Sequence, residues 1–196
     1  MPNCFLETLA ADILNDCDNI TKSGIETDVI LIPRKLIDFT ASTISGTNRM
    51  LITDLTLASG TGFLLEGVKQ LNGYNWEFVP SEETVDRYRH VFTGVIMTPS
   101  AANRLAFSQL AKGEQYVVVV NKKYKGADQE DAFLVLGWDT GLYVTAATEN
   151  DKEVDSAIQF TLSNKDAELE DEAPRILLET DYATTLTAFT NKFAAA

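Results

Sequence analysis

Tyr116-Val117-Val118-Val119-Val120 is the stretch that decides the fold class. Four consecutive β-branched residues lose side-chain freedom in a helix, whereas they suit an extended strand. A short, continuous apolar run is also typical of a strand that is buried. We therefore expect a sheet with residues 116–120 in its core, and the flanking sequence must supply the neighbouring strands.

Short apolar or alternating segments on both sides of this stretch predict those neighbours. Each is bounded by glycine, asparagine or proline, which interrupt strands. The predicted strands are 25–32, 50–57, 63–71, 76–79, 87–97, 132–138, 142–148, 158–163 and 175–179. The turns 71–74, which contains Asn72-Gly73, and 137–141 predict hairpin connections, as does the charged loop that follows residue 148.

Three segments predict helices. The clearest begins after an N-cap at Ser100 and stops at Gly113, with an apolar stripe of Leu105, Ala106, Leu110 and Ala111. Asp181 predicts the cap of a second helix that reaches residue 193, with Ala183, Leu186 and Phe189 on one side. The spacing of Leu6, Leu9 and Ile13 allows a short helix over 5–14.

These elements predict a mainly β (α+β) fold, an antiparallel β-sandwich or barrel with one internal flanking helix and a C-terminal helix. The chain has 196 residues, a length typical of one domain. We expect a single domain over 1–196, with an N-terminal segment at 1–22. Residues 40–48 are almost all Ser, Thr, Gly, Ala and Asn, which predicts a flexible loop rather than a packed element.

The charge is strongly negative. The 16 Lys and Arg residues stand against 29 Asp and Glu, which gives a net charge of -13 and argues against a protein that reads DNA or RNA sequence. Nine of the acids lie between 149 and 172 against two lysines, which predicts solvated, mobile loops. Two basic clusters, Arg87 with Arg89 and Lys122-Lys123-Tyr124-Lys125, are candidates for docking against an acidic neighbour.

Targeting and redox signals are weak. Residues 1–5 lack a basic segment, and no run approaches the ~20 apolar residues that span a bilayer, so we expect synthesis in the cytoplasm and no membrane insertion. Cys4, Cys17 and the lone His90 do not form a tetrahedral zinc set. We expect reduced thiols, no metal and no cofactor.

Catalytic motifs are also weak, so we expect that the chain is not an enzyme and has no catalytic residue. Residues 59–62 lack the pattern of a phosphate loop and predict a hairpin turn. A Ser-His-Asp triad would require His90, which we predict to be a half-exposed strand residue. Glu82-Glu83 and 170–172 predict solvated loops, and the alternate acids of 16–18 lack the glycine and distal glutamate of a calcium loop.

Several short motifs together carry a family resemblance. From about residue 16 to 189, the sequence resembles tail tube or major tail structural proteins of tailed bacteriophages. The motifs are an Asn-Asp-Cys-Asp-Asn turn at 15–19, Gly24-Ile25, Pro99-Ser100, Gly126-Ala127-Asp128 before the strand at 132–135, the turn at 137–142, and Leu-Glu-Thr-Asp-Tyr-Ala at 178–183.

The resemblance implies a virion structural protein, located in the tail. Such subunits join as six-membered rings that stack into a tube, with other tail or connector proteins as further partners and with DNA as translocated cargo that is not specifically bound. It also implies that segments such as 40–48 and 151–155 contact the adjacent ring. We further expect acids to face the channel, which would repel DNA, and the two basic clusters to meet acids across subunit interfaces.

Two alternatives remain open. The first is another ring-forming structural protein, such as a connector or baseplate ring of the virion or the inner tube of a contractile injection system. The second is a soluble ligand- or carbohydrate-binding β-sandwich that uses Trp76, Trp138 and Tyr143 as stacking platforms.

Overall fold

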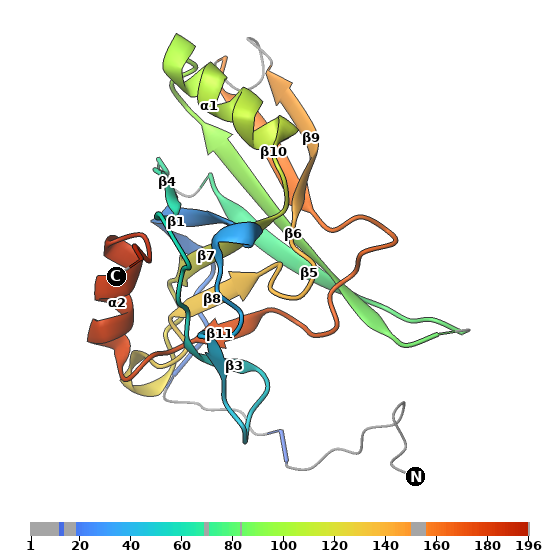
Figure 1. Cartoon of the computed structure of the whole chain (residues 1–196), viewed down its shortest axis with the longest axis vertical. Helices are drawn as coiled ribbons and strands as arrows, with labels where there is room; N and C mark the ends of the chain where they lie inside the picture. The colour runs from blue at the N-terminus through green and yellow to red at the C-terminus, as the bar shows by residue number, and fades with distance from the viewer. Residues whose placement is uncertain (1–11, 14–18, 69–70, 83, 150–155, 196) are drawn as a thin grey trace.

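Two stacked sheets and a helix form the layers of the molecule (Figure 1). The computed structural model describes residues 12–13, 19–68, 71–82, 84–149 and 156–195. The helix expected over 5–14, both cysteines and the acids of 16–18 therefore lie wholly or mostly outside the described residues.

The larger sheet has seven strands in the order β2-β3-β11-β8-β7-β1-β4. Their bounds are β1 Ile25–Pro33, β2 Thr43–Ile44, β3 Leu51–Asp54, β4 Phe63–Leu65, β7 Tyr116–Lys122, β8 Phe133–Leu136 and β11 Arg175–Leu177. Strand β7 lies between β1 and β8, and its four valines are fully buried, which confirms the prediction for 116–120. All pairs are antiparallel except β11 with β3.

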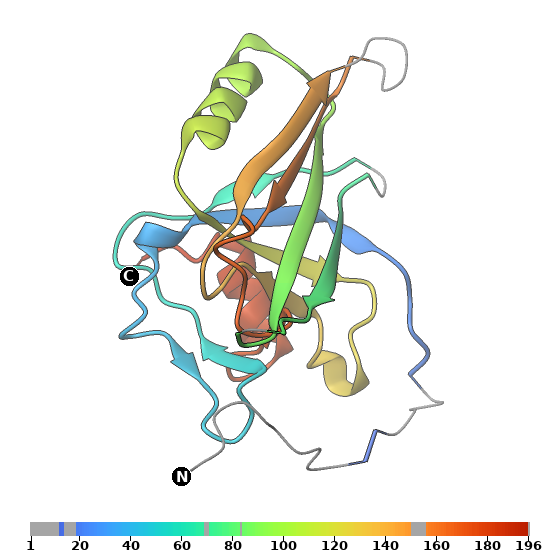
Figure 2. The same cartoon turned by 90° about the vertical axis from the view of Figure 1, so that its right-hand side faces the viewer.

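The smaller sheet has four antiparallel strands in the order β5-β6-β10-β9. Their bounds are β5 Gly73–Val79, β6 Arg87–Ile96, β9 Tyr143–Glu149 and β10 Ile158–Ser163. In Figure 2 these strands lie side by side in front of the larger sheet, from β9 in orange to β5 in green. We call this unit the open sheet.

Two hydrophobic cores hold the layers together. One contains Val118, Val120, Phe92 and Phe160 and fills the space between the two sheets. The other contains Val117, Val119, Phe133 and Phe189, with α2 (Tyr182–Thr190) as its cover. Alternate valines of β7 thus serve opposite cores, as the two-residue period of a strand requires. The mainly β fold with an internal and a C-terminal helix is confirmed; the described residues form a sandwich and no closed barrel.

Both predicted helix caps are present. Ser100 Oγ accepts a hydrogen bond from the Asn103 N–H at the start of α1 (Ala101–Lys112), and Asp181 Oδ1 does the same for the Thr184 N–H. The predicted stripe of α1 is partly wrong: Leu110 packs on the core together with Phe107, whereas Leu105 is 61% exposed. Because α1 lies at one end of the open sheet (Figure 1), only a narrow side of the helix is covered.

Three predicted hairpin turns are wrong, since each connects strands that are not neighbours. Residues 59–62 lead from β3 to β4, which are far apart in the larger sheet, and 71–74 and 137–141 lead from the larger sheet to the open sheet. The Asn72 carboxamide is buried and accepts the Val95 N–H, so it fixes the start of β5 instead of turning a hairpin. The loop after residue 148 does join the paired strands β9 and β10.

Short elements complete the chain. The 40–48 segment, predicted to lack a packed element, contains β2, where the Thr43 and Thr53 hydroxyls lie 2.8 Å apart. Two single-turn 3-10 helices follow β1 and β7, at Arg34–Leu36 and Ala127–Gln129. The final helix ends at Thr190, before the predicted residue 193.

Candidate functional site

The two edges of the open sheet are the strongest candidate site. Within the described residues, β5 pairs only with β6, and β9 pairs only with β10. Natural proteins protect such edges with lysine, proline or bulges. The sequences of β5 (Gly-Tyr-Asn-Trp-Glu-Phe-Val) and β9 (Tyr-Val-Thr-Ala-Ala-Thr-Glu) contain no lysine, arginine or proline. Strand β9 has one bulge, at Thr145, where its register with β10 shifts. The regular stretches of both edges can therefore accept another strand.

The face of the open sheet that points away from the core is uncharged at its centre. Phe92, Phe160 and Leu162 point into the core, so the alternate residues of the same strands point outward. With their cross-strand neighbours, these outward positions include Thr93, Thr148, Gln159 and Thr161.

The charges of this face lie where β5 and β6 approach their connecting loop, and they are paired. Arg89 contacts both Glu77 and Asp166, and Arg87 contacts Asp171. The basic cluster predicted to dock on a neighbour is thus already matched by acids of its own chain. The second cluster also has partners in the chain: Lys125 Nζ lies 3.0 Å from the Tyr182 hydroxyl and 3.7 Å from Glu26.

Exposed aromatic side chains occupy the β5 edge. Trp76 and Phe78 are 48% and 49% exposed, and their rings lie 5.8 and 5.5 Å from the ring of Tyr88. The three aromatics named as stacking platforms for the binding-module alternative are not gathered here, because Trp138 is buried and the ammonium of Lys165 covers the Tyr143 ring at 3.6 Å.

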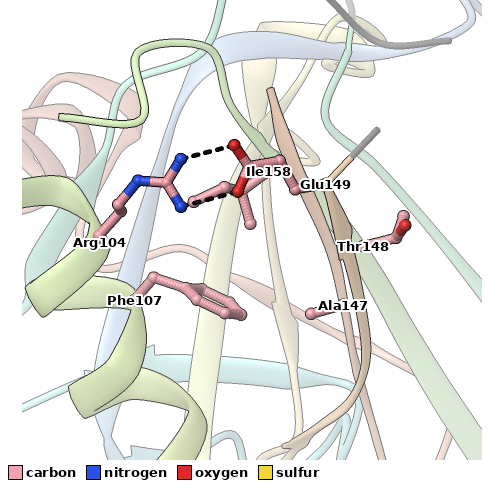
Figure 3. Close-up of a pocket in the computed structure, with 6 residues that line it drawn as sticks. All are labelled: Arg104, Phe107, Ala147, Thr148, Glu149 and Ile158. Atoms are coloured by element: carbon pink, nitrogen blue, oxygen red, sulfur yellow. Dashed lines mark hydrogen bonds and ion pairs between the residues drawn. The ribbon is translucent and has the colours of Figure 1, made fainter. Parts of the chain in front are cut away.

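A small pocket lies beside the β9 edge, between this strand and α1 (Figure 3). Its walls are Arg104, Phe107, Ala147, Thr148, Glu149 and Ile158. The Arg104 guanidinium donates to both oxygens of Glu149, at 2.7 and 2.6 Å, and this pair of hydrogen bonds lowers the pKa of the Glu149 carboxyl. The floor of the pocket is apolar and its rim carries a fixed ion pair.

Behind the open sheet, a buried carboxylate fixes the connection between the sheets. Glu170 is fully buried, and its oxygens accept the backbone N–H groups of Asp139, Thr140 and Gly141 at 2.7, 3.1 and 3.2 Å. The Asn164 amide donates to it at 2.9 Å. The prediction that 170–172 is a solvated loop is therefore wrong for Glu170. Three consecutive N–H groups in a turn form a ready anion site, which only the Gly-rich turn at 137–141 could have indicated.

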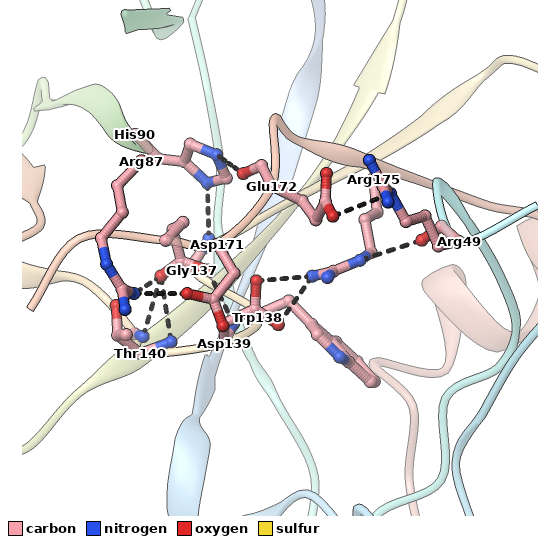
Figure 4. A network of polar contacts seen from close by, with 12 residues as sticks. Arg49, Arg87, His90, Gly137, Trp138, Asp139, Thr140, Asp171, Glu172 and Arg175 are labelled. Atoms are coloured by element: carbon pink, nitrogen blue, oxygen red, sulfur yellow. Dashed lines mark hydrogen bonds and ion pairs between the residues drawn. The ribbon is translucent and has the colours of Figure 1, made fainter. Parts of the chain in front are cut away.

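His90 belongs to the same region (Figure 4) and is 1% exposed, so the prediction of a half-exposed histidine is wrong. Its Nδ1 accepts the Gly137 N–H at 3.1 Å, and its Nε2 lies 3.0 Å from the Glu172 carbonyl oxygen. Burial lowers the pKa of His90 to about 4, so the ring is neutral at pH 7 with its proton on Nε2. Both ring nitrogens hold backbone groups in place.

A buried ion pair extends this network. Arg175 Nη1 lies 2.9 Å from both oxygens of Asp139, and Arg175 Nε donates to the Arg49 carbonyl oxygen (Figure 4). Burial raises the pKa of Asp139, and Arg175 opposes that effect. These contacts connect the loop after β8 to strand β11 and to Arg49, two residues before β3, so the region has a structural role.

The described residues contain no group of three or more His, Cys, Asp or Glu side chains that could hold a metal ion. No helix among them is both long and apolar enough to span a bilayer.

Comparison with protein-family models, with curated proteins and with solved structures found no match for this chain. The open sheet and the sequence motifs are therefore the features that bear on the function.

Proposed function

We propose that the chain is a tail tube subunit of a tailed bacteriophage, a structural protein that assembles into stacked rings around a channel for DNA. The observation that carries the proposal is the pair of edge strands, β5 and β9, which contain no lysine, arginine or proline and lie on one four-stranded sheet. The sequence motifs that resemble tail tube proteins support it independently.

Strand directions favour a ring. Three antiparallel steps separate β5 from β9, so the two edge strands run in opposite directions within one subunit. When copies are related by rotation about an axis, β9 of one copy and β5 of the next meet antiparallel, as the rest of the sheet does. Such a head-to-tail contact uses two different surfaces and closes when the rotation completes a circle.

The resulting channel suits DNA. Six copies would contribute about 24 strands, and a barrel of this size with ~4.8 Å strand spacing and ~36° tilt has a backbone diameter of about 45 Å. A channel of this width leaves room for duplex DNA, whose major groove alone is about 12 Å wide. The lining would be uncharged at its centre, with Arg87 and Arg89 paired to acids at one end, rather than the acidic lining that the net charge suggested.

Electron microscopy of the concentrated, purified protein tests the proposal. We expect rings or tubes for the natural sequence. Ala146 lies on the free β9 edge and is exposed, so Ala146→Lys should abolish assembly, because an edge lysine opposes strand pairing. Ala183→Lys, at an exposed position on α2, is the matched control and should assemble normally.

The outcomes separate the alternatives. Single rings without tubes would favour a connector or baseplate ring over a tube. A natural chain that stays monomeric at high concentration, or an Ala146→Lys chain that assembles as well as the control, would overturn the proposal.

A further inference from the structure

An aromatic protrusion and a pocket lie on opposite edges of the open sheet. Trp76 stands on β5 with half of its surface exposed, although large apolar side chains are normally buried. The pocket between α1 and β9 lies at the other edge. Tyr88 contacts the Trp76 ring within the chain, but half of the indole surface stays exposed.

Both features are on the same side of the sheet. Trp76 is opposite His90, which is two residues before the core residue Phe92, and Ala147 is opposite the core residue Phe160. Since side chains alternate along a strand, Trp76 and Ala147 both point toward the core side. An edge-to-edge contact between two copies would therefore bring them to the same face.

The strand register sets their relative height. Ala147 pairs with Phe160 and Phe160 pairs with Gly94, and the register of β5 places position 72 at this level. Strands in a barrel tilt by about 36°, which shifts the register by about one residue per strand, or about four residues per four-stranded copy. All strands share a right-handed twist, so each strand shifts the register in the same direction and the shifts add. Their sum moves residue 76 of the next copy to the level of Ala147.

From these relations, and resting on the ring proposed above, we infer that Trp76 of each copy inserts into the α1–β9 pocket of its neighbour. The indole would cover Phe107 and Ile158, and the small side chain of Ala147 leaves space for it. Arg104, held by Glu149, presents its guanidinium for stacking on the indole face. The pocket of about 290 Å³ is just below the range for ligand sites, roughly 300 to 1,000 Å³, which suits a side chain.

Disulfide crosslinking tests the inference directly. In a background with Cys4→Ser and Cys17→Ser, the variant Trp76→Cys with Ala147→Cys should form a ladder of crosslinked oligomers on a non-reducing gel. Crosslinks within one chain are excluded by geometry, because three strand spacings, ~14 Å, separate the two edges, and a disulfide needs Cα atoms within ~7 Å. The matched control is Trp76→Cys with Ala146→Cys, because Ala146 points to the opposite face.

The result also distinguishes this inference from the proposed function. A ladder with Ala147→Cys and none with Ala146→Cys supports the insertion of Trp76. Rings or tubes without the ladder, or with a ladder for the Ala146→Cys pair, would overturn the inference and leave the tube proposal intact. Absence of any assembly by the natural chain would overturn both.

Discussion

Acid should weaken the fold through the buried side chain of His90. This histidine is the only one in the chain and is buried with both ring nitrogens bonded to the backbone. Its pKa is about 4 in the folded protein and about 6.5 in an unfolded chain. Between these values the unfolded state binds the proton and the folded state does not, so stability falls as the pH falls from 6.5 to 4.

The size of the effect follows from the two pKa values. Their difference corresponds to about 3 kcal/mol once the pH is below both, and about 2 kcal/mol is already lost at pH 5. Above pH 7 the contribution of His90 is fully present. Urea unfolding of the dilute, unassembled protein, followed by tryptophan fluorescence at pH 7.5 and pH 5, measures the loss.

A comparison with His90→Asn isolates this contribution from that of the carboxyl groups. Asparagine can accept the Gly137 N–H but does not change charge over this range. Between pH 7.5 and pH 5 the natural chain should lose about 2 kcal/mol more than the variant. Equal losses in the two proteins, or an NMR titration of the His90 ring near pH 6.5 in the folded state, would refute the reasoning.

Two further substitutions probe the packing behind the open sheet. Glu170→Gln places an amide group against backbone N–H donors and should lower the free energy of unfolding in urea by about 3 kcal/mol. Its control is Asp171→Asn, in an exposed ion pair, which should lower it by less than about 1 kcal/mol. Similar losses for both variants would show that Glu170 does not need its charge. Gly94→Ala would bring a Cβ within 2.5 Å of Phe160 and should lower the free energy of unfolding by about 1–3 kcal/mol. Gly73→Ala is its control, since a Cβ there meets nothing within 4 Å, and equal thermal midpoints would contradict the crowding at Gly94.

Much of the fold could be predicted from local sequence because local physics decides it. The valines of β7 have one comfortable conformation, and Ser100 and Asp181 cap their helices through contacts only three residues away. The turns could not be assigned in the same way. A Gly-rich turn such as 137–141 reverses or redirects the chain equally well, and pairing with distant strands decides which sheet receives the next segment.

The candidate site was less predictable than the fold. The sequence shows Trp76 as an aromatic residue, but its exposure depends on β5 being an edge strand, which the sequence does not reveal. The sequence predicts a solvated Glu170 because acidic runs usually are solvated, whereas its burial depends on backbone donors supplied from 30 residues away. The sequence shows Arg87 and Arg89 as a cluster, but their partners Asp166 and Asp171 come from a loop that reaches them only in the folded chain.

The order of segments in the open sheet also has a consequence for synthesis. Strands β5 and β6 are consecutive in the chain and can pair as soon as residue 96 has left the ribosome. The pocket needs α1, β9 and β10, and is complete only after residue 158. In the assembly proposed above, a nascent chain thus presents Trp76 early, before its own α1–β9 pocket can receive Trp76 of another copy. If the proposed assembly is correct, polymerisation on the ribosome is thereby limited, and rings would grow from chains that have finished folding.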